Sequence, residues 1–159
     1  MNWRGSITVQ DRIFASLPYL LPLFYSLEFG EPLLRQFPAL GIILVPLIPV
    51  QFIYSTIPLA GLIIFFVLFL LVVRNERIAH FIRFNAMQAI LLQIVLLLCS
   101  LAWDFVLQRI LGFNLVTQTL FNIIFLGTLV ACGYSVVQSL IGRYAEIPAL
   151  SEAAYAQVR

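Results

Sequence analysis

The sequence has little charge and no lysine. Only 10% of its 159 residues are charged, against about 25% in an ordinary soluble domain. All nine basic residues are arginine, and the net charge of +2 is too small to indicate a nucleic-acid partner. The rest of the composition is 62% hydrophobic. These proportions exclude an ordinary soluble domain and predict a helical protein embedded in a membrane.

Residues that carry catalysis are also scarce. The sequence has none of the short motifs that form common nucleophile, zinc-protease or phosphate-binding sites. His80 is the only histidine, and Glu76 is the only acidic residue near it, which is too few ligands for a zinc site. We therefore expect a protein that is not an enzyme, with no catalytic residue, no cofactor and no metal.

Charged residues divide the chain into four apolar runs, which we predict to be transmembrane helices because a span needs about 20 mostly apolar residues. The runs cover residues 13–27, 57–73, 84–103 and 115–140. The first is short, and we expect Gly30 and Pro32 to end its helix. Residues 143–159 are expected to form a polar C-terminal tail. The predicted fold is all-α, a single integral membrane domain over residues 1–159.

A proline-rich segment, residues 37–54, lies between the first and second runs. Each proline leaves one backbone carbonyl without its helical hydrogen bond, and hydrocarbon has no water to replace it. We predict a re-entrant or interfacial segment here. The arginines favour the same four-span count, because with both termini inside they divide seven to two. The inner set is Arg4, Arg12, Arg74, Arg77, Arg83, Arg143 and Arg159, and the outer set is Arg35 and Arg109.

The charged stretch before the third run is the most informative part of the sequence. At about 100° per residue, Glu76, Arg77, His80 and Arg83 share one helical face, so the stretch can lie on the bilayer surface. It is either a topology anchor that binds anionic headgroups or a docking turn for a partner. The candidate residues are Arg74, Asn75, Arg77, His80, Arg83, Asn85 and Gln88.

Polar residues inside the predicted spans need hydrogen-bond partners across helices. Asn85 and Gln88 in the third span are either structural contacts, to this chain or to another subunit, or the lining of a polar path. In the fourth span, Gly127, Ala131, Ser135 and Ser139 recur every four residues. Small residues at this spacing predict a helix-packing seam, either within the chain or in a homo-oligomer.

Several motifs resemble a known family. They are Tyr19-Leu-Leu-Pro22, Phe29-Gly30, Val72-Val-Arg74-Asn75, Tyr134-Ser-Val-Val-Gln138-Ser, Glu146-Ile-Pro148 and, above all, His80-Phe-Ile-Arg83-Phe-Asn85-Ala-Met-Gln88-Ala-Ile. With these motifs the chain resembles the twenty-kilodalton membrane subunit family of the chloroplast inner-envelope protein-import translocon, in its short cyanobacterial or plastid-encoded form. The resemblance implies four transmembrane helices, both termini on the stromal or cytoplasmic side, and no catalytic residue.

The resemblance also implies a function and partners. The protein is expected to be a translocon membrane subunit in the plastid inner envelope or cyanobacterial plasma membrane, acting with other membrane subunits and translocating precursor polypeptides. Anionic lipids and a second copy of the chain are further expected partners. The alternative is a subunit of a small-solute channel or transporter, in which Pro46, Pro49 and Gln51 would supply a broken helix. No inverted repeat accompanies them.

Overall fold

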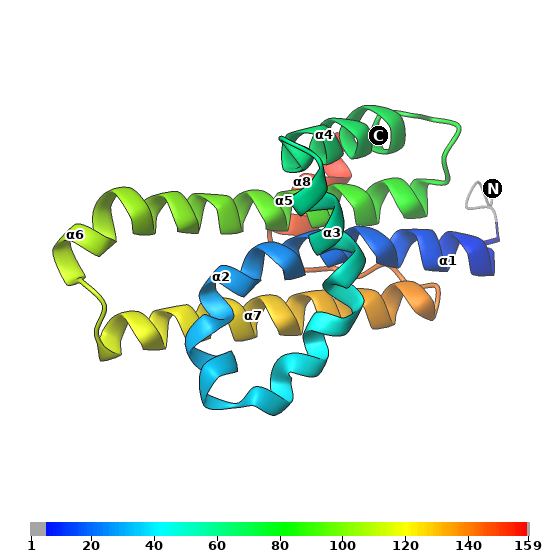
Figure 1. Ribbon diagram of the computed structural model, residues 1–159. Helices are drawn as coiled ribbons and strands as arrows, with labels where there is room; N and C mark the ends of the chain where they lie inside the picture. The colour runs from blue at the N-terminus through cyan, green and yellow to red at the C-terminus, as the bar shows by residue number, and fades with distance from the viewer. Residues whose placement is uncertain (1–5, 159) are drawn as a thin grey trace.

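The computed structural model describes residues 6–158, and these residues form helices joined by short turns (Figure 1). The α-helices are α1 (Val9–Ser16), α2 (Leu20–Gln36), α3 (Ile48–Thr56), α4 (Ala60–Phe66), α5 (His80–Ala102), α6 (Gln108–Leu111), α7 (Leu115–Leu140) and α8 (Leu150–Gln157). Two 3₁₀ segments, η1 (Leu17–Tyr19) and η2 (Pro38–Leu47), and two π-helical segments, η3 (Val67–Val73) and η4 (Trp103–Leu107), connect them. The predicted all-α fold is confirmed.

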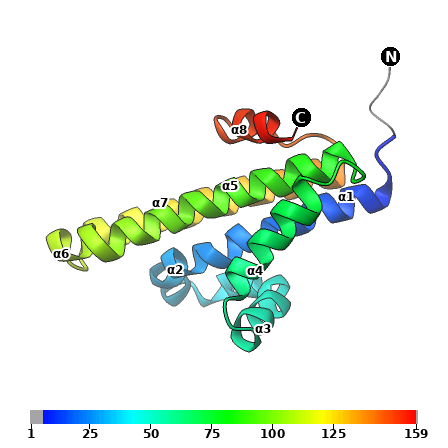
Figure 2. The same ribbon diagram turned by 90° about the horizontal axis from the view of Figure 1, so that it is seen from above.

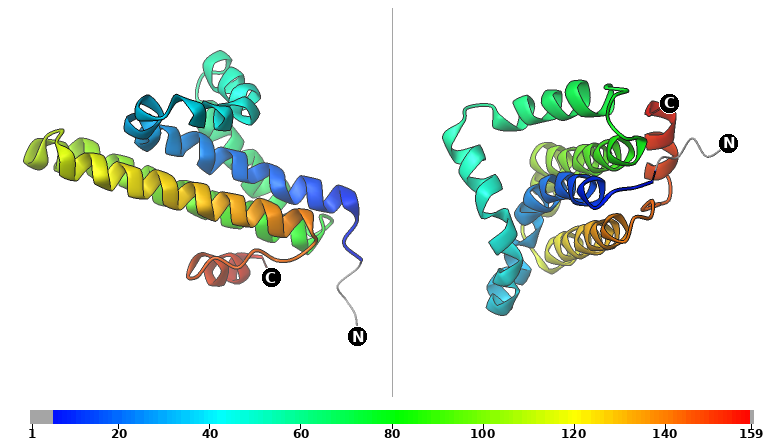
Figure 3. Two further views of the ribbon diagram at one scale, coloured as in Figure 1. Left: turned by 90° about the horizontal axis from the view of Figure 1, so that it is seen from below. Right: turned by 90° about the vertical axis from the view of Figure 1, so that its right-hand side faces the viewer.

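Three long helical rods form the body of the molecule. The rod made of α1, η1 and α2 packs against both α5 and α7 (Figure 3). Phe29 of α2 packs with Leu96 of α5, Trp103 of η4, and Phe121 and Phe125 of α7. The ring centroids of Phe29 and Phe121 are 5.1 Å apart, in an edge-on arrangement. Large apolar side chains therefore fill the space between the rods.

Four helical segments are long and apolar enough to cross a membrane, which confirms the predicted number. They are Val9–Gln36, Pro38–Thr56, His80–Leu111 and Leu115–Leu140. One of these four segments differs from the predicted spans, because Pro38–Thr56 is long enough and the predicted second span is not. Ala60–Val73, which corresponds to the predicted second span, has only 14 helical residues, and at 1.5 Å per residue it is shorter than the about 30 Å of a hydrocarbon core. Pro58 and the left-handed Leu59 shorten it, since they form a turn before the helix.

The first helix is longer than the sequence predicted. It begins with a capping box, in which the Thr8 hydroxyl accepts from the Asp11 backbone and the Asp11 carboxylate accepts from the Thr8 backbone. The prediction that Gly30 and Pro32 end it is wrong, because α2 continues to Gln36. Gly30 is buried where α2 meets the ring of Phe125, so tertiary packing compensates for the local weakness of glycine and proline.

Residues 38–73, here called the proline arm, connect α2 to α5. The arm consists of η2, α3, α4 and η3. In the right-hand view of Figure 3, α5 and α7 are seen end-on, whereas η2 and α3 run across the view. The arm is attached to α2 by aromatic contacts, with the rings of Phe24 and Tyr54 4.6 Å apart. The proline-rich half thus lies across the bundle, in the direction expected of an interfacial segment.

The last two rods are bounded by local signals. Asn114 caps α7 by accepting from the backbones of Val116 and Thr117, and α7 spans Leu115–Leu140 as predicted. The third predicted span, residues 84–103, is extended at both ends, to His80 and Leu111. The C-terminal tail is not simply polar, since it forms α8, which lies along α5 (Figure 2). Ser151 and Ala154 of α8 are buried, and so is Val158, which follows the helix.

Candidate functional site

The inner arginines that the structure describes gather at one end of the bundle. The start of α1, the start of α5 and the end of α7 meet there, at the opposite end from α6 (Figure 1). Arg12, Arg77 and Arg83 line one cavity at this end, whereas Arg109 belongs to α6. Arg4 and Arg159 lie outside the described residues. This end, called here the arginine end, holds the whole predicted docking turn.

The turn itself is not helical before His80. Residues Arg74 to Ala79 form a loop, in which the Asn75 side chain accepts from the backbone of Arg77. Glu76 and Arg77 therefore do not share a helical face with His80 and Arg83, because Asn75 favours a local turn over helix. Arg74 and Arg77 are exposed, while Arg83 is buried at 8% exposure. The predicted face is divided into an outer pair and an inner arginine.

Asn85 and Gln88 are fully buried and form a hydrogen-bonded cluster, here called the polar junction, with Tyr19 and Ser139. The Tyr19 hydroxyl donates to Asn85 Oδ1 at 2.8 Å and accepts from Gln88 Nε2 at 2.9 Å. The Ser139 hydroxyl donates to the same Asn85 oxygen at 3.0 Å. Gln88 Nε2 also donates to the Ala145 carbonyl at 2.8 Å. The polar junction thus ties η1, α5 and α7 together inside one chain.

The polar junction shows what these two side chains contact within the chain. The Asn85 amide and the Gln88 Nε2 group all have partners in this chain, so another subunit is not needed to satisfy Asn85. Only Gln88 Oε1 and the Ser135 hydroxyl are buried here without a partner among the described residues. In an apolar surrounding such bonds fix the register of the three helices, because any slip would leave polar atoms unpaired.

Arg83 and His80 are also held by the chain. Arg83 Nε donates to the carbonyl of Val73 at 2.9 Å, which closes the loop between η3 and α5. His80 Nδ1 lies 2.9 Å from the hydroxyl of Tyr144, and its ring stacks near Tyr155 of α8. The Phe84 ring packs against both tyrosines, with its centroid 5.1 Å from that of Tyr144 and 4.4 Å from that of Tyr155. These contacts attach the C-terminal segment to the start of α5.

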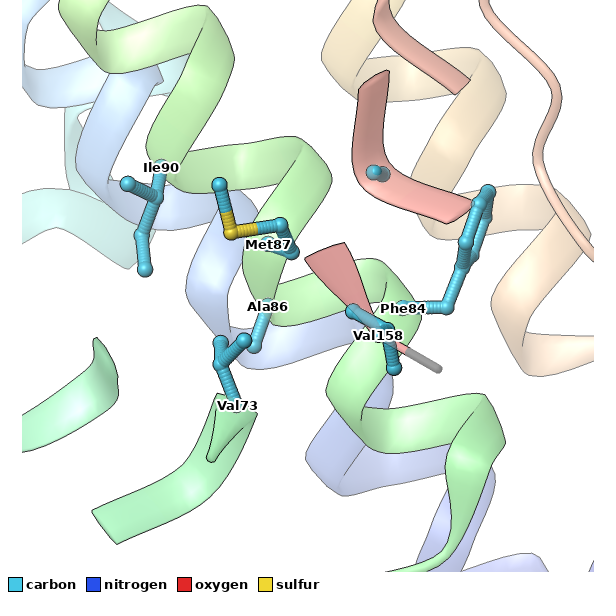
Figure 4. Close-up of a cluster of buried hydrophobic side chains, with 7 residues drawn as sticks. Val73, Phe84, Ala86, Met87, Ile90 and Val158 are labelled. Atoms are coloured by element: carbon cyan, nitrogen blue, oxygen red, sulfur yellow. The ribbon is translucent and has the colours of Figure 1, made fainter. Parts of the chain in front are cut away.

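An apolar cluster completes the attachment of α8. Figure 4 shows Val73 of η3, four side chains of α5 and Val158 directed toward one another. The α5 members are Phe84, Ala86, Met87 and Ile90, and Ala154 of α8 belongs to the same cluster. Most side chains in the first three turns of α5 are thereby buried. The motif that carried the family resemblance is mostly a packing and hydrogen-bonding element.

A polar cavity of about 870 Å³ opens between α1, the loop before α5 and the end of α7. Its charged lining is Asp11, Arg12, Glu76, Arg77 and Arg83. Arg12 Nε is buried and has no hydrogen-bond partner among residues 6–158. Gly142, with φ of +79°, ends α7 and leaves room for the Arg12 guanidinium to lie against it. Within those residues no group of three or more His, Cys, Asp and Glu side chains is placed to hold a metal ion.

The predicted seam on α7 is only partly a packing surface. Ser135 and Ser139 are buried, but Gly127 is exposed with no neighbouring atom within 4 Å of a Cβ placed there. Four-residue spacing turns by about 40° at each step on an α-helix, so the stripe rotates out of the interface. The close approach of helices occurs instead at Gly30, whose added Cβ would lie 2.7 Å from the Phe125 ring. A homo-oligomer contact at Gly127 stays a prediction.

Arg12 was predicted to lie on the inner side, but its place at the cavity wall and the contacts of Tyr19 and Tyr144 were not predicted. Tyr19 and Asn85 are 66 residues apart, and no local pattern connects them. The available signal was the presence of buried amides in the third span, which required polar partners on neighbouring helices. Tyr19 and Tyr144 each combine an apolar ring with a hydroxyl, which suits such a partner.

Nearly all of the described helices lie within a region that matches a known sequence family. Residues 9–154 match the family described as "Chloroplast import apparatus Tic20-like". The chain is 54% identical over 151 residues to a "Tic20 family protein" of Synechocystis sp., covering 94% of each chain. It is 35% identical over 155 residues to "Protein TIC 20-II, chloroplastic" of Arabidopsis thaliana, covering 93% of this chain and 72% of the relative. It is likewise 35% identical to "Tic20 family protein Ycf60" of Gracilaria tenuistipitata var. liui, covering 97% and 78%.

Proposed function

The chain belongs to the Tic20-like family of the chloroplast import apparatus, and from this membership we propose that it is a non-catalytic membrane subunit of a protein-translocating assembly. The observation that carries the proposal is the family match over residues 9–154, which include all four long apolar segments and the arginine end. Relatives named as chloroplastic proteins align over nearly the whole chain. The proposed cargo is a precursor polypeptide in an extended or partly unfolded form.

The packing of the bundle supports a role within an assembly. Phe29, Phe121 and Phe125 fill the space between the rods, so the described helices enclose no polar path along their axis. In the most apolar 18-residue stretch of each of the four long segments, only 11% to 44% is buried within the chain. The remaining apolar surface is available to lipid and to other membrane subunits. We therefore propose that a path for a polypeptide forms between this subunit and its neighbours.

The arginines of the charged turn differ in their surroundings, and we propose different roles for them. Arg83 is tied to the Val73 carbonyl, so it acts in folding. Arg74 is exposed and does not line the polar cavity, which makes it the candidate for docking a partner. If Arg74 docks an acidic partner through its guanidinium fork, Arg74→Lys should lower partner recovery about tenfold, since lysine cannot replace a bidentate contact. Arg109→Lys, at the opposite end, is the matched control.

The small-solute channel is the less supported alternative. It relied on polar residues within the spans, and Asn85 and Gln88 are engaged in the polar junction instead of facing a path. Pro46, Pro49 and Gln51 do not interrupt the helix, because the 3₁₀ segment η2 continues directly into α3, and Gln51 is exposed at the surface of the arm. A translocon subunit is compatible with these buried polar residues and with the proline arm, and it does not require a pore within a single copy of the chain.

Crosslinking to a precursor in transit tests the proposal directly. A photoreactive side chain is placed at Phe52 of the arm or Val130 of α7, both exposed. A precursor arrested in the membrane should form adducts with at least one position. The same precursor without its targeting segment is the control and should form none. Absence of adducts at both positions, with the arrested precursor present in the same membrane, would contradict the proposed function.

A further inference from the structure

The arginine end borders an apolar groove that the proposed function does not use. The groove has a volume of about 570 Å³ and lies between the first helical rod and the proline arm. Its lining includes Phe14 and Leu21 on one wall, Ile53 of α3 and Leu68 of η3 on another, and Ile78 and Ile82 at one end. Every residue that lines it is apolar. A groove of this kind accepts a hydrocarbon chain and offers nothing to a polar solute.

The groove and the polar cavity adjoin. Ile78 lines both of them. Ile82 lines the groove, and its neighbours in the sequence, Phe81 and Arg83, line the cavity. A ligand that fills both must be polar and anionic at one end and apolar at the other. The order also matches a bilayer, because the cavity lies at the arginine end and the groove runs along spans toward the membrane interior.

The charges of the cavity indicate the sign of the polar end. Arg12, Arg77 and Arg83 oppose Asp11 and Glu76, which leaves one positive charge. Asp11 is already hydrogen-bonded to the backbone of Thr8, and neither Arg12 nor Arg77 forms an ion pair with a described residue. Arg12 Nε is buried without a partner at the cavity wall. One phosphodiester, with one negative charge and acceptor oxygens for a guanidinium fork, satisfies these groups.

We propose that the polar cavity and the apolar groove together form a binding site for one anionic glycerophospholipid of the inner leaflet. The phosphate accepts from Arg12 and Arg77, and one acyl chain lies in the groove between the first rod and the arm. Such a lipid would hold the loop before α5 against α1 and would fill the gap under the arm. The proposal concerns the isolated chain and is independent of the translocation role.

Lipid retention on the purified protein tests the site. The protein is incubated with equal amounts of dioleoyl phosphatidylglycerol and dioleoyl phosphatidylcholine, which share acyl chains, and bound lipid is counted by native mass spectrometry. We expect about tenfold preference for phosphatidylglycerol, the scale of one charge-assisted contact. Arg12→Gln should abolish the preference, and Arg109→Gln should keep it. Equal retention of both lipids, or an equal loss in both variants, would overturn the proposal.

A second pair of variants tests the groove without changing charge. Ile53→Trp at the partly exposed rim should fill the groove and lower retention of both lipids, whereas Val130→Trp on the open face of α7 should not. Thermal melting in detergent confirms that each variant is folded, and any variant that fails is replaced by Ile53→Phe or Arg12→Lys. Inorganic phosphate is added as a competitor. Full displacement by phosphate with a silent Ile53→Trp would indicate a simple anion site and would overturn the lipid proposal.

Discussion

The first turns of α5 and the proline-rich half of the arm are both apolar helix, but their surroundings are opposite. Nine of the ten residues 81–90 are buried, whereas Leu47 and Val50 are the only buried residues between 38 and 56. The α5 turns are packed by α1, η1, α2, η3 and α8, while η2 and α3 contact mainly α2. The difference shows which surface folds the chain and which surface is left for lipid or other subunits.

The largest effect is expected at Gly30, where the first rod packs closely against α7. Gly30→Leu places side-chain atoms into the ring of Phe125 and should lower the free energy of unfolding in detergent by about 3 kcal/mol. Gly127→Leu is the matched control on the same helix pair, because nothing lies within 4 Å of its position. That change should stay within about 0.5 kcal/mol of wild type. Equal losses in both variants would place the helix seam at Gly127 after all.

A smaller effect is expected at the cover of α5. Ala154 is fully buried in the cluster with Phe84 and Met87, so Ala154→Glu should release α8 and lower the unfolding free energy by about 2 kcal/mol. The tail should then be cut faster by protease. Ala156→Glu, two residues along the same helix and exposed, should be silent. A silent Ala154→Glu would remove α8 from the folded core.

The smallest effect on stability is expected in the arm. The informative measurement there is the side of the membrane on which its residues lie. Single cysteines at Leu40 and Gln51 should change the unfolding free energy by less than about 0.5 kcal/mol. Both should be labelled by a membrane-impermeant reagent from the outer face, while Arg74→Cys should be labelled from the inner face. Labelling of Gln51 from the inner face alone would show that Pro38–Thr56 crosses the membrane, which would remove the contrast between arm and bundle.

Local signals in the sequence were sufficient for some elements and not for others. The apolar run 115–140 has the same bounds as α7, whereas the run 13–27 covers only part of the first rod, which begins at Val9 after the Thr8–Asp11 capping box. Gly30 and Pro32 predicted a helix end that does not occur, because packing against Phe125 holds a helix that propensity alone would end. Asn85 and Gln88 could be recognised as polar side chains within a predicted span. Their partner Tyr19 is 66 residues from Asn85, and only the folded arrangement brings the two together.

The central claim is that the motif from His80 to Gln88 folds the chain and does not act chiefly as a docking surface. The most direct test is a double-mutant cycle with Tyr19→Phe and Asn85→Leu, measured on the isolated protein with no partner present. The account predicts that Asn85→Leu destabilises this protein and that the two sites are coupled by about 0.6 to 1.7 kcal/mol. Unchanged stability and zero coupling, together with lost recovery of partner subunits, would contradict it.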